Sequence, residues 1–273
     1  MTVKPLPITV MLGGPSAERE VSLRGGQAVA RALRSLGHHV TELDPVPGKW
    51  KLPEGTEVVF LVLHGTYGED GTVQEELEKL GVPYTGCDSV SSRIAFDKVL
   101  TKQKCIEAGI PTSPYVVLNS NEAALPGKLR LPLVIKPVRQ GSSVGLQFVE
   151  NAPEWRAALQ ESLRFDSEVV VEEKIVGRET TVGILDGKAL PVVEVRPVSG
   201  AYDYQNKYTA GATEYFCPAA FDAKTTERIQ AAGLGAFQAV EGRDYGRVDI
   251  MVKENGDPVV LEVNTLPGMT ETS

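Results

Sequence analysis

The chain has 273 residues, which is enough for two or three domains, and its 42% hydrophobic and 23% charged residues are typical of a globular enzyme. A net charge of −8 argues against a nucleic-acid partner bound through its phosphates. Three scattered cysteines argue against a disulfide framework and a thiolate zinc site, and no apolar run approaches the ~20 residues of a membrane helix. We therefore expect a cytoplasmic protein with no nucleic-acid or membrane partner.

The first hundred residues alternate predicted strands and helices. Strands are expected at 8–12, 39–43 and 57–63, with helices at 18–35 and 73–80. This alternation predicts a parallel sheet that is covered on both faces. One long helix is expected to follow at 89–108, because Gly109 and Pro111 form a typical C-terminal stop.

The rest of the chain is predicted to be α+β with antiparallel strand pairs. Strands are expected at 133–137, 145–149 and 169–173, and a helix at 225–241. Asp186-Gly187 and Asn255-Gly256 are dipeptides of tight hairpin turns. The pattern changes near residues 98 and 186, which predicts three domains over 1–98, 99–186 and 187–273.

The segment Gly141–Gly145 lies between two predicted strands, which excludes a P-loop, since a P-loop joins a strand to a helix. Its backbone N–H groups and two serine hydroxyls suit a phosphate chain, and a flexible turn is the alternative interpretation. Lys136 interrupts the apolar run LPLVIKP just before it. An ammonium there is costly unless an anion meets it or the side chain reaches water.

Two carboxylates and a carboxamide lie on the last two predicted strands. Glu262 and Asn264 alternate along one strand and share a face, and a hairpin at Asn255-Gly256 sets the strand of Asp249 beside them. Hard oxygen ligands of this kind suit Mg²⁺ bound together with phosphates. The alternative is a solvated polar face of the sheet.

The N-terminal third offers two further candidate residues. The Gly13-Gly14 turn joins a strand to a helix but lacks the GxGxxG fingerprint of a dinucleotide site. Glu18 begins that helix, where the helix dipole favours its ionised form. The carboxylate either has only this local role or also binds an ammonium ion. His64 follows a buried strand, at the sheet edge where α/β proteins bind ligands, and a structural role is its alternative.

Together these segments resemble the ATP-grasp superfamily, and specifically the D-alanine–D-alanine ligase family. The resemblance implies a Rossmann-like substrate-binding domain at 1–98, followed by two α+β ATP-grasp subdomains, at 99–186 and 187–273, that clasp ATP. The motifs that carry it run in the family's order over nearly the whole chain. They are GGPSAEREVSL (13–23), LHGTYGEDGTVQ (63–74), PYTG (83–86), DK (97–98), IKPVRQGSSVG (135–145), YDYQNKY (202–208), YFCPA (215–219), GRVDIM (246–251) and LEVNTLPGMT (261–270).

The resemblance also implies the residues that hold the nucleotide and two Mg²⁺ ions, with Mn²⁺ as an alternative metal. The phosphates are assigned to three lysines and the glycine-rich loop, and the adenine and ribose to the segment after residue 172. The assigned residues are Lys98, Lys136, Lys207, Ser142 and Ser143 for the phosphates; Glu173, Lys174, Val176 and Glu179 for the nucleoside; and Asp249, Glu262 and Asn264 for the metal ions.

For the amino-acid substrates, the resemblance implies that Glu18 binds the ammonium of the first D-alanine and forms a lid-closing set with Ser142 and Tyr208. Arg247 and the backbone N–H of Gly268 are expected to form an oxyanion hole. The remaining implied substrate residues are His64 and Ser273.

The implied reaction joins two D-alanines through an acyl phosphate to give D-alanyl-D-alanine for peptidoglycan synthesis and cell shape. Relatives are often dimers, so the resemblance implies a homodimer as one assembly open to this chain. Another ATP-grasp carboxylate–amine ligase, or a non-catalytic nucleotide-binding module, is the alternative. Relatives continue by a helix or two beyond the position of Ser273. We therefore expect the 273-residue chain to be less stable than one extended by the family's terminal helix, and to ligate D-alanine weakly.

Overall fold

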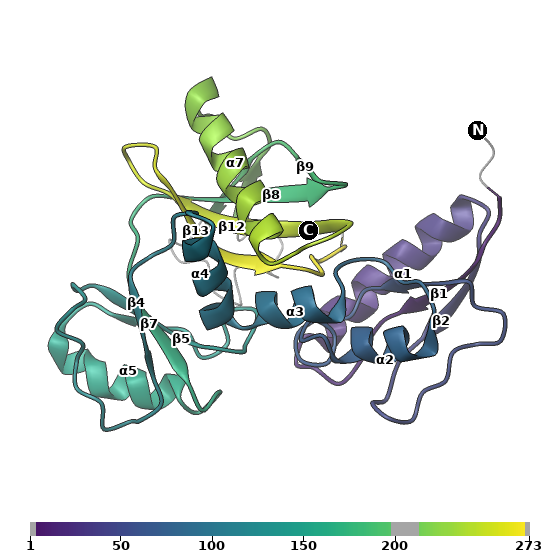
Figure 1. The fold of residues 1–273 in the computed structure, drawn as a ribbon, viewed down its shortest axis with the longest axis horizontal. Coiled ribbons are helices and arrows are strands. Elements are labelled where there is room, and N and C mark those ends of the chain that lie inside the picture. The colour runs from purple at the N-terminus through teal and green to yellow at the C-terminus, as the bar shows by residue number, and fades with distance from the viewer. Residues whose placement is uncertain (1–3, 198–212, 271–273) are drawn as a thin grey trace. The chain divides into compact units, whose positions relative to one another are not determined.

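The computed structural model describes residues 4–197 and 213–270 (Figure 1). Its contacts divide the chain into two compact units, which we describe separately. The first contains Met1–Arg93, Gly242–Gly246 and Asn264–Ser273, and the second contains Ile94–Glu241 and Arg247–Val263. Within the described ranges, no helix combines the length and the hydropathy needed to cross a bilayer.

The first unit is built on a three-stranded parallel sheet in the order β2-β1-β3. One face packs Val10 and Leu12 against Ala30 of helix α1, and the other packs Met11 and Leu61 against helix α2. The prediction of a parallel sheet covered on both faces is therefore confirmed. The elements are β1 (Pro7–Met11), α1 (Arg19–Ser35), β2 (His39–Leu43), β3 (Val58–Leu61), α2 (Thr72–Leu80) and α3 (Ser89–Phe96), the last of which crosses into the second unit.

The second unit begins with a four-stranded antiparallel sheet in the order β4-β7-β5-β6. Leu133, Ile135 and Val171 project from one face into a core that is closed by Trp155 and Leu159 of α5. The opposite face carries polar side chains and is part of the site described below. The elements are α4 (Lys98–Glu107), β4 (Tyr115–Leu118), β5 (Leu133–Pro137), β6 (Gln147–Val149), a 3₁₀ turn η1 (Ala152–Glu154), α5 (Trp155–Ser162) and β7 (Val169–Glu173).

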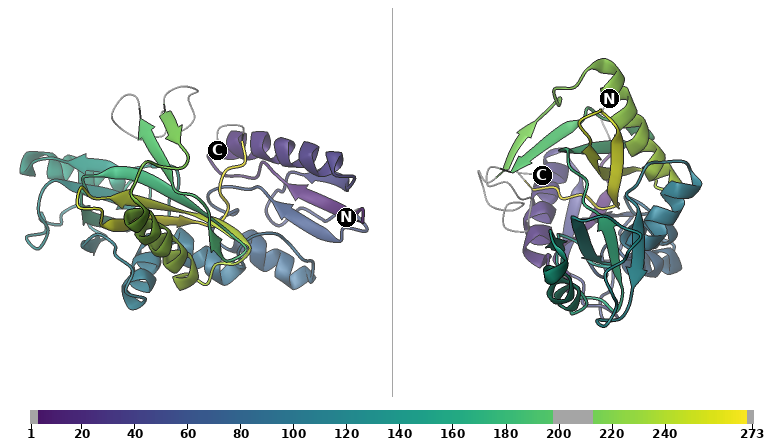
Figure 2. Two further views of the ribbon diagram at one scale, coloured as in Figure 1. Left: turned by 90° about the horizontal axis from the view of Figure 1, so that it is seen from above. Right: turned by 90° about the vertical axis from the view of Figure 1, so that its left-hand side faces the viewer.

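A second antiparallel sheet completes this unit, in the order β11-β10-β8-β12-β13 with β9 beside β8. Helix α7 lies along one face (Figure 2), where the backbone of Gly233 comes close to Val182 of β8. The elements are β8 (Arg178–Leu185), β9 (Lys188–Ala189), β10 (Val193–Pro197), β11 (Thr213–Phe216), α7 (Ala223–Ala239), β12 (Tyr245–Val252) and β13 (Pro258–Asn264).

The expected single helix at 89–108 is wrong, because the helix is interrupted at Asp97. The backbone of Asp97 is extended, with φ −88° and ψ 107°, and its carboxylate accepts hydrogen bonds from the N–H groups of Val99 (2.9 Å) and Leu100 (3.0 Å). These bonds cap the start of a new helix, α4. The break places Lys98 at a helix N-terminus rather than in a helix interior.

The three cysteines are free thiols, of which Cys87 and Cys105 are buried and Cys217 is exposed. Burial raises the pKa of both Cys87 and Cys105 to about 11. No two of the three cysteines are joined by a disulfide in the structure.

Candidate active site

The second unit contains a cavity of about 730 Å³ whose walls come from both of its antiparallel sheets. Strands β5 and β7 and the loop after β5 form one wall, and β8, β10, β12 and β13 form the other. Seven of the nine residues predicted to bind the nucleotide line it, and so do two predicted metal ligands. They are Lys98, Lys136, Ser143, Glu173, Lys174, Val176 and Glu179, with Asp249 and Glu262.

The glycine-rich loop connects β5 to β6, the two strands expected on either side of it, which pair antiparallel with Leu133 opposite Val149. Ser142 and Ser143 both adopt left-handed conformations, with φ of 49° and 60°. Gly145 follows with φ 71°, and a β-carbon on it would lie 2.6 Å from the Phe165 ring. Glycine is therefore required at position 145 both for its backbone conformation and for the close packing of the loop.

Lys98 is held at the loop by its ammonium, which donates to the carbonyl of Gln140. Arg139 ties the same loop to the start of α4, because its guanidinium contacts Asp97 at 3.0 Å and Glu168 at 2.7 Å. Its backbone N–H also donates to Asp166. The loop and Lys98 are thus joined by charged hydrogen bonds as well as by chain connectivity.

The two sheets are linked by the short segment between β7 and β8, which carries the predicted adenine residues. Glu173 accepts a hydrogen bond from the backbone N–H of Arg130 at 3.0 Å, which together with the Arg130 side chain lowers the pKa of Glu173. Lys174 pairs with Glu150 at 2.6 Å, on the chain just after β6. A β-carbon on Gly177 would lie 2.2 Å from the Val252 carbonyl oxygen, so only glycine lets the segment pass β12 this closely.

Lys136 does meet an anion, as the cost of burying its ammonium requires, and that anion is Glu172. One Glu172 oxygen pairs with Lys136 and the other with Lys102 of α4, at 2.6 Å. Glu172 and Lys102 are 2% and 3% exposed. The sequence reasoning missed both residues, although acidic Glu172 at the end of the apolar run VVV was the available signal.

Asp249 and Glu262 lie on the neighbouring strands β12 and β13, as the predicted hairpin requires. Asp249 accepts two hydrogen bonds from Arg247, and Asn264 ends β13 two residues after Glu262, on the same strand face. No cluster of three His, Cys, Asp or Glu side chains with metal-binding geometry occurs in residues 4–197 and 213–270. A metal site that is made of two carboxylates, one amide oxygen and nucleotide phosphates does not need three such side chains.

In the first unit, Glu18 is the N-cap of α1, one position before the helix begins. Its carboxylate lies 2.9 Å from where a β-carbon on Gly65 would stand, which places it beside the residue that follows buried His64. Asp44 fixes the preceding glycine turn, because it accepts hydrogen bonds from the Gly14 N–H (2.9 Å) and from Arg19 (2.8 Å). Glu18 and His64 thus flank one point at the end of β3.

The segment after β13 returns to the first unit. Leu266 is buried in the same core as Leu63, and the Met269 backbone lies about 3.5 Å from where a β-carbon on Gly25 of α1 would stand. Gly268 therefore belongs to the same unit as Glu18. Of the other predicted residues, Ser142 lies in the second unit, so its predicted bond to Glu18 stays a prediction. Lys207, Tyr208 and Ser273 lie outside the described residues.

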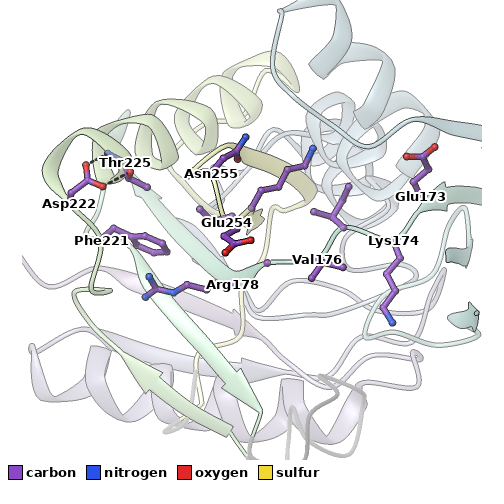
Figure 3. A pocket seen from close by; sticks show the side chains of 14 residues that line it. Glu173, Lys174, Val176, Arg178, Phe221, Asp222, Thr225, Glu254 and Asn255 are labelled. Carbon is purple, nitrogen blue, oxygen red and sulfur yellow. Dashed lines mark hydrogen bonds between the residues drawn. The ribbon is translucent and has the colours of Figure 1, made fainter. Parts of the chain in front are cut away.

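A second groove, of about 1150 Å³, shares the segment between β7 and β8 with this cavity (Figure 3). Phe221 stacks on the guanidinium of Arg178 at 3.7 Å, and Asp222 caps α7 through the N–H of Thr225 at 2.9 Å. Each of these residues therefore already contacts another residue of the groove. The groove contributes no predicted residue beyond those in the shared segment.

Two antiparallel sheets around a cavity lined by lysines and carboxylates, in a chain that also contains a parallel-sheet unit, define an ATP-grasp ligase fold. The model for the C-terminal part of D-Ala–D-Ala ligases matches residues 105–273, and the model for the N-terminal part matches residues 41–87. The chain belongs to the D-alanine–D-alanine ligase family.

Relatives in two bacteria and one solved protein illustrate the similarity. The D-alanine–D-alanine ligase of Methylacidiphilum infernorum is 49% identical over 98% of this chain and 88% of its own length. The ligase of Aquifex aeolicus is 45% identical over 97% of this chain and 92% of its own length. The Bacillus anthracis ligase superposes with a TM-score of 0.86 at 38% identity, covering 97% of this chain and 88% of its own. The same ligase complexed with ATP gives 0.85 at 36% identity, covering 98% and 89%.

Proposed function

We propose that this chain joins two D-alanine molecules into D-alanyl-D-alanine at the expense of ATP, supplying a peptidoglycan precursor. The observation that carries the proposal is the cavity between the two sheets, where Lys98 and Lys136 face the same space as the carboxylates Asp249 and Glu262. Family membership and the ATP complex of the Bacillus anthracis relative support it. A carboxylate is a poor acyl donor at neutral pH, so ATP must first activate it as an acyl phosphate.

In the nucleotide half of the site, Lys98 and Lys136 are proposed to hold the phosphates, with the backbone N–H groups of the loop at Ser142 and Ser143. Ammonium groups and N–H donors offset the charge that spreads over a phosphoryl group during transfer. Lys207 is proposed as a third phosphate ligand. The adenine and ribose are assigned to the segment after β7, through Glu173, Lys174, Val176 and Glu179.

Asp249, Glu262 and Asn264 are proposed to hold two Mg²⁺ ions, with Mn²⁺ as an alternative. The donor set fits, because two carboxylates and an amide oxygen are hard ligands, and the carboxylates share a cavity with the two phosphate-binding lysines. When bound, the ions neutralise phosphate oxygens and orient the transferring group. The protein's own part is to fix these oxygens on adjacent strands.

In the substrate half, Glu18 is proposed to bind the ammonium of the first D-alanine, close to His64. Arg247 and the Gly268 N–H are proposed to stabilise the oxyanion that forms when the second amine attacks, an effect worth about 3–4 kcal/mol per donor in other enzymes. Ser142 and Tyr208 are proposed to close the site with Glu18, which would keep water from the acyl phosphate. Ser273 is proposed to contact the second substrate.

We further propose a cytoplasmic location, consistent with three free thiols. The purified chain, ATP, Mg²⁺ and D-alanine provide the direct test of activity. We expect phosphate release that depends on D-alanine, with D-alanyl-D-alanine as the product identified by mass spectrometry. Release with L-amino acids but not D-alanine would favour another carboxylate–amine ligase. ATP binding with no phosphate release for any amino acid would favour a nucleotide-binding module.

A further inference from the structure

A buried charge cluster lies behind the cavity, formed by Lys102, Ser113, Glu172 and Lys136. Lys136 and Glu172 line the cavity, whereas Lys102 projects from α4 behind them and is not among the lining residues. Lys136 and Glu172 lie on adjacent strands, β5 and β7, whose register places Glu172 opposite Val134. Both side chains therefore project from the sheet face that is opposite the α5 core.

The ammonium of Lys102 donates to three side-chain oxygens, two of them within the cluster. It donates to Thr112 Oγ1 at 2.8 Å, to Ser113 Oγ at 2.9 Å and to Glu172 Oε2 at 2.6 Å. An ammonium has three protons, so these acceptors satisfy it completely. Ser113 in turn donates its hydroxyl proton to the same Glu172 oxygen. Lys102 and Ser113 together fix one oxygen of Glu172.

The other oxygen of Glu172 pairs with Lys136, whose side chain is 15% exposed, compared with 4% for Lys102. Burial opposes the charged forms, but the ammonium groups of Lys136 and Lys102 outweigh it and lower the pKa of Glu172 to about 2. Burial would lower the pKa of Lys136, and Glu172 reverses this, so that the pKa is raised. Burial also lowers the pKa of Lys102, and Glu172 acts against this. With both lysines protonated, the cluster is two cations sharing one anion, with a net charge of +1.

We propose that Lys102 is a positioning residue for Lys136, acting through Glu172. Because Lys102 and Ser113 hold one Glu172 oxygen, the carboxylate orients Lys136 without cancelling its charge, and one net positive charge faces the cavity. Without Lys102, the cluster would be a neutral Glu172–Lys136 pair. An anionic phosphate chain would then meet less positive charge. This inference rests on the proposed role of Lys136 as an ATP phosphate ligand.

The test compares Lys102→Met with Lys104→Met, which removes the same charge from the same helix at a half-exposed position paired only loosely with Glu107, at 3.6 Å. ADP affinity is measured by calorimetry, and KM for ATP and for D-alanine by steady-state kinetics. We expect Lys102→Met to raise the ADP Kd and the ATP KM by about tenfold or more, equivalent to about 1.4 kcal/mol, with little change in the D-alanine KM. Lys104→Met should match the unmodified chain.

A second comparison identifies the route of the effect. In a Lys136→Met background, adding Lys102→Met should cost no further ADP affinity, because no Lys136 is left to position and a Glu172 buried without either cation takes its neutral form. A full additional tenfold loss would overturn the proposal. So would a folded Lys102→Met variant with unchanged ADP affinity, since Lys102 would then be only structural.

Two further measurements keep the outcome interpretable. If Lys102→Met does not fold, Ser113→Ala replaces it, since that variant removes the hydroxyl bridge and leaves every charge in place. We expect a smaller ADP affinity loss in the same direction, and an unchanged affinity in folded Ser113→Ala would overturn the proposal. Failure of the unmodified chain to bind ADP would instead contradict the proposed function, independently of Lys102.

Discussion

Arg247 holds Asp249 in a two-pronged hydrogen bond along one face of β12, with Nε donating to Oδ1 at 2.9 Å and Nη2 donating to Oδ2 at 3.0 Å. The pair joins a proposed oxyanion-stabilising group to a proposed metal ligand. Because a guanidinium presents two parallel donors, it fixes the plane of the carboxylate as well as its position. The proposed metal ligand and the proposed oxyanion-stabilising group therefore hold each other in position on this strand.

Replacing Arg247 with lysine should uncouple this link. A lysine keeps the charge but cannot make the paired bonds, so Asp249 loses its fixed plane and the oxyanion loses a directed donor. We expect kcat for dipeptide formation to fall by roughly 10²-fold or more. Steady-state kinetics checks this, with circular dichroism as the control for folding. A kcat within twofold of the unmodified chain would contradict the assignment of Arg247.

Glu262→Gln tests the metal site directly. The substitution removes one carboxylate charge with little change in side-chain volume, so we expect dipeptide formation to be abolished in a chain that folds normally. Glu254→Gln is the matched control, because it makes the same change at an exposed position in the turn between β12 and β13. Near-normal turnover of Glu262→Gln at ordinary Mg²⁺ concentrations would show that Glu262 is not a ligand.

Gly145→Ala tests how tightly the glycine-rich loop is packed. Gly145 and Gly187 have nearly the same backbone angle, with φ of 71° and 70°, but a β-carbon on Gly187 meets nothing within 4 Å. Gly187→Ala therefore measures the conformational strain alone, and Gly145→Ala adds the clash with Phe165. We expect the Gly145 variant to lose about 1–3 kcal/mol more in the free energy of unfolding, measured with denaturant. Equal losses would mean that the loop relaxes freely.

The acid stability of the protein should depend on Glu172. Its pKa is about 2 in the folded chain against 4.5 for an ordinary glutamate, so in acid the unfolded chain binds the proton more readily. The stabilisation from ionised Glu172 is complete above about pH 5 and is lost as the pH falls toward 2. Between these limits, the unfolding free energy should fall more steeply than in Glu172→Gln, by up to about 1.4 kcal/mol per pH unit. Denaturant titrations from pH 6 to 2.5 measure how the unfolding free energy of each chain depends on pH. The same dependence in both chains would contradict the lowered pKa of Glu172.

The elements that local pattern determines were predictable from the sequence. Strands at His39–Leu43, Leu133–Pro137 and Val169–Glu173 have the bounds expected from their apolar runs. The break at Asp97 was not predicted, because apolar periodicity continues across a capping residue. Helix α5 was missed, although Trp155 and Leu159 are buried, because eight residues give a weak periodic signal.

The residues of the candidate site also fall into two groups, those that the sequence could predict and those that it could not. The residues lining the cavity could be found because they lie within contiguous motifs, such as Lys136 and Ser143 around the glycine-rich loop. Lys102 could not be found, because its partners Ser113 and Glu172 are 11 and 70 positions away in the sequence and meet it only after folding. A lysine on a short helix is normally exposed, so its burial is visible only in three dimensions.

The contrast between one exposed thiol and two buried ones provides a labelling site without mutagenesis. At neutral pH, Cys87 and Cys105 are both shielded and protonated, so a maleimide dye should react at Cys217 alone. Cys217 directly follows β11, one edge strand of the second sheet, whose strands β12 and β13 supply Asp249 and Glu262. A single fluorophore there would mark the second sheet at one defined position in the native chain.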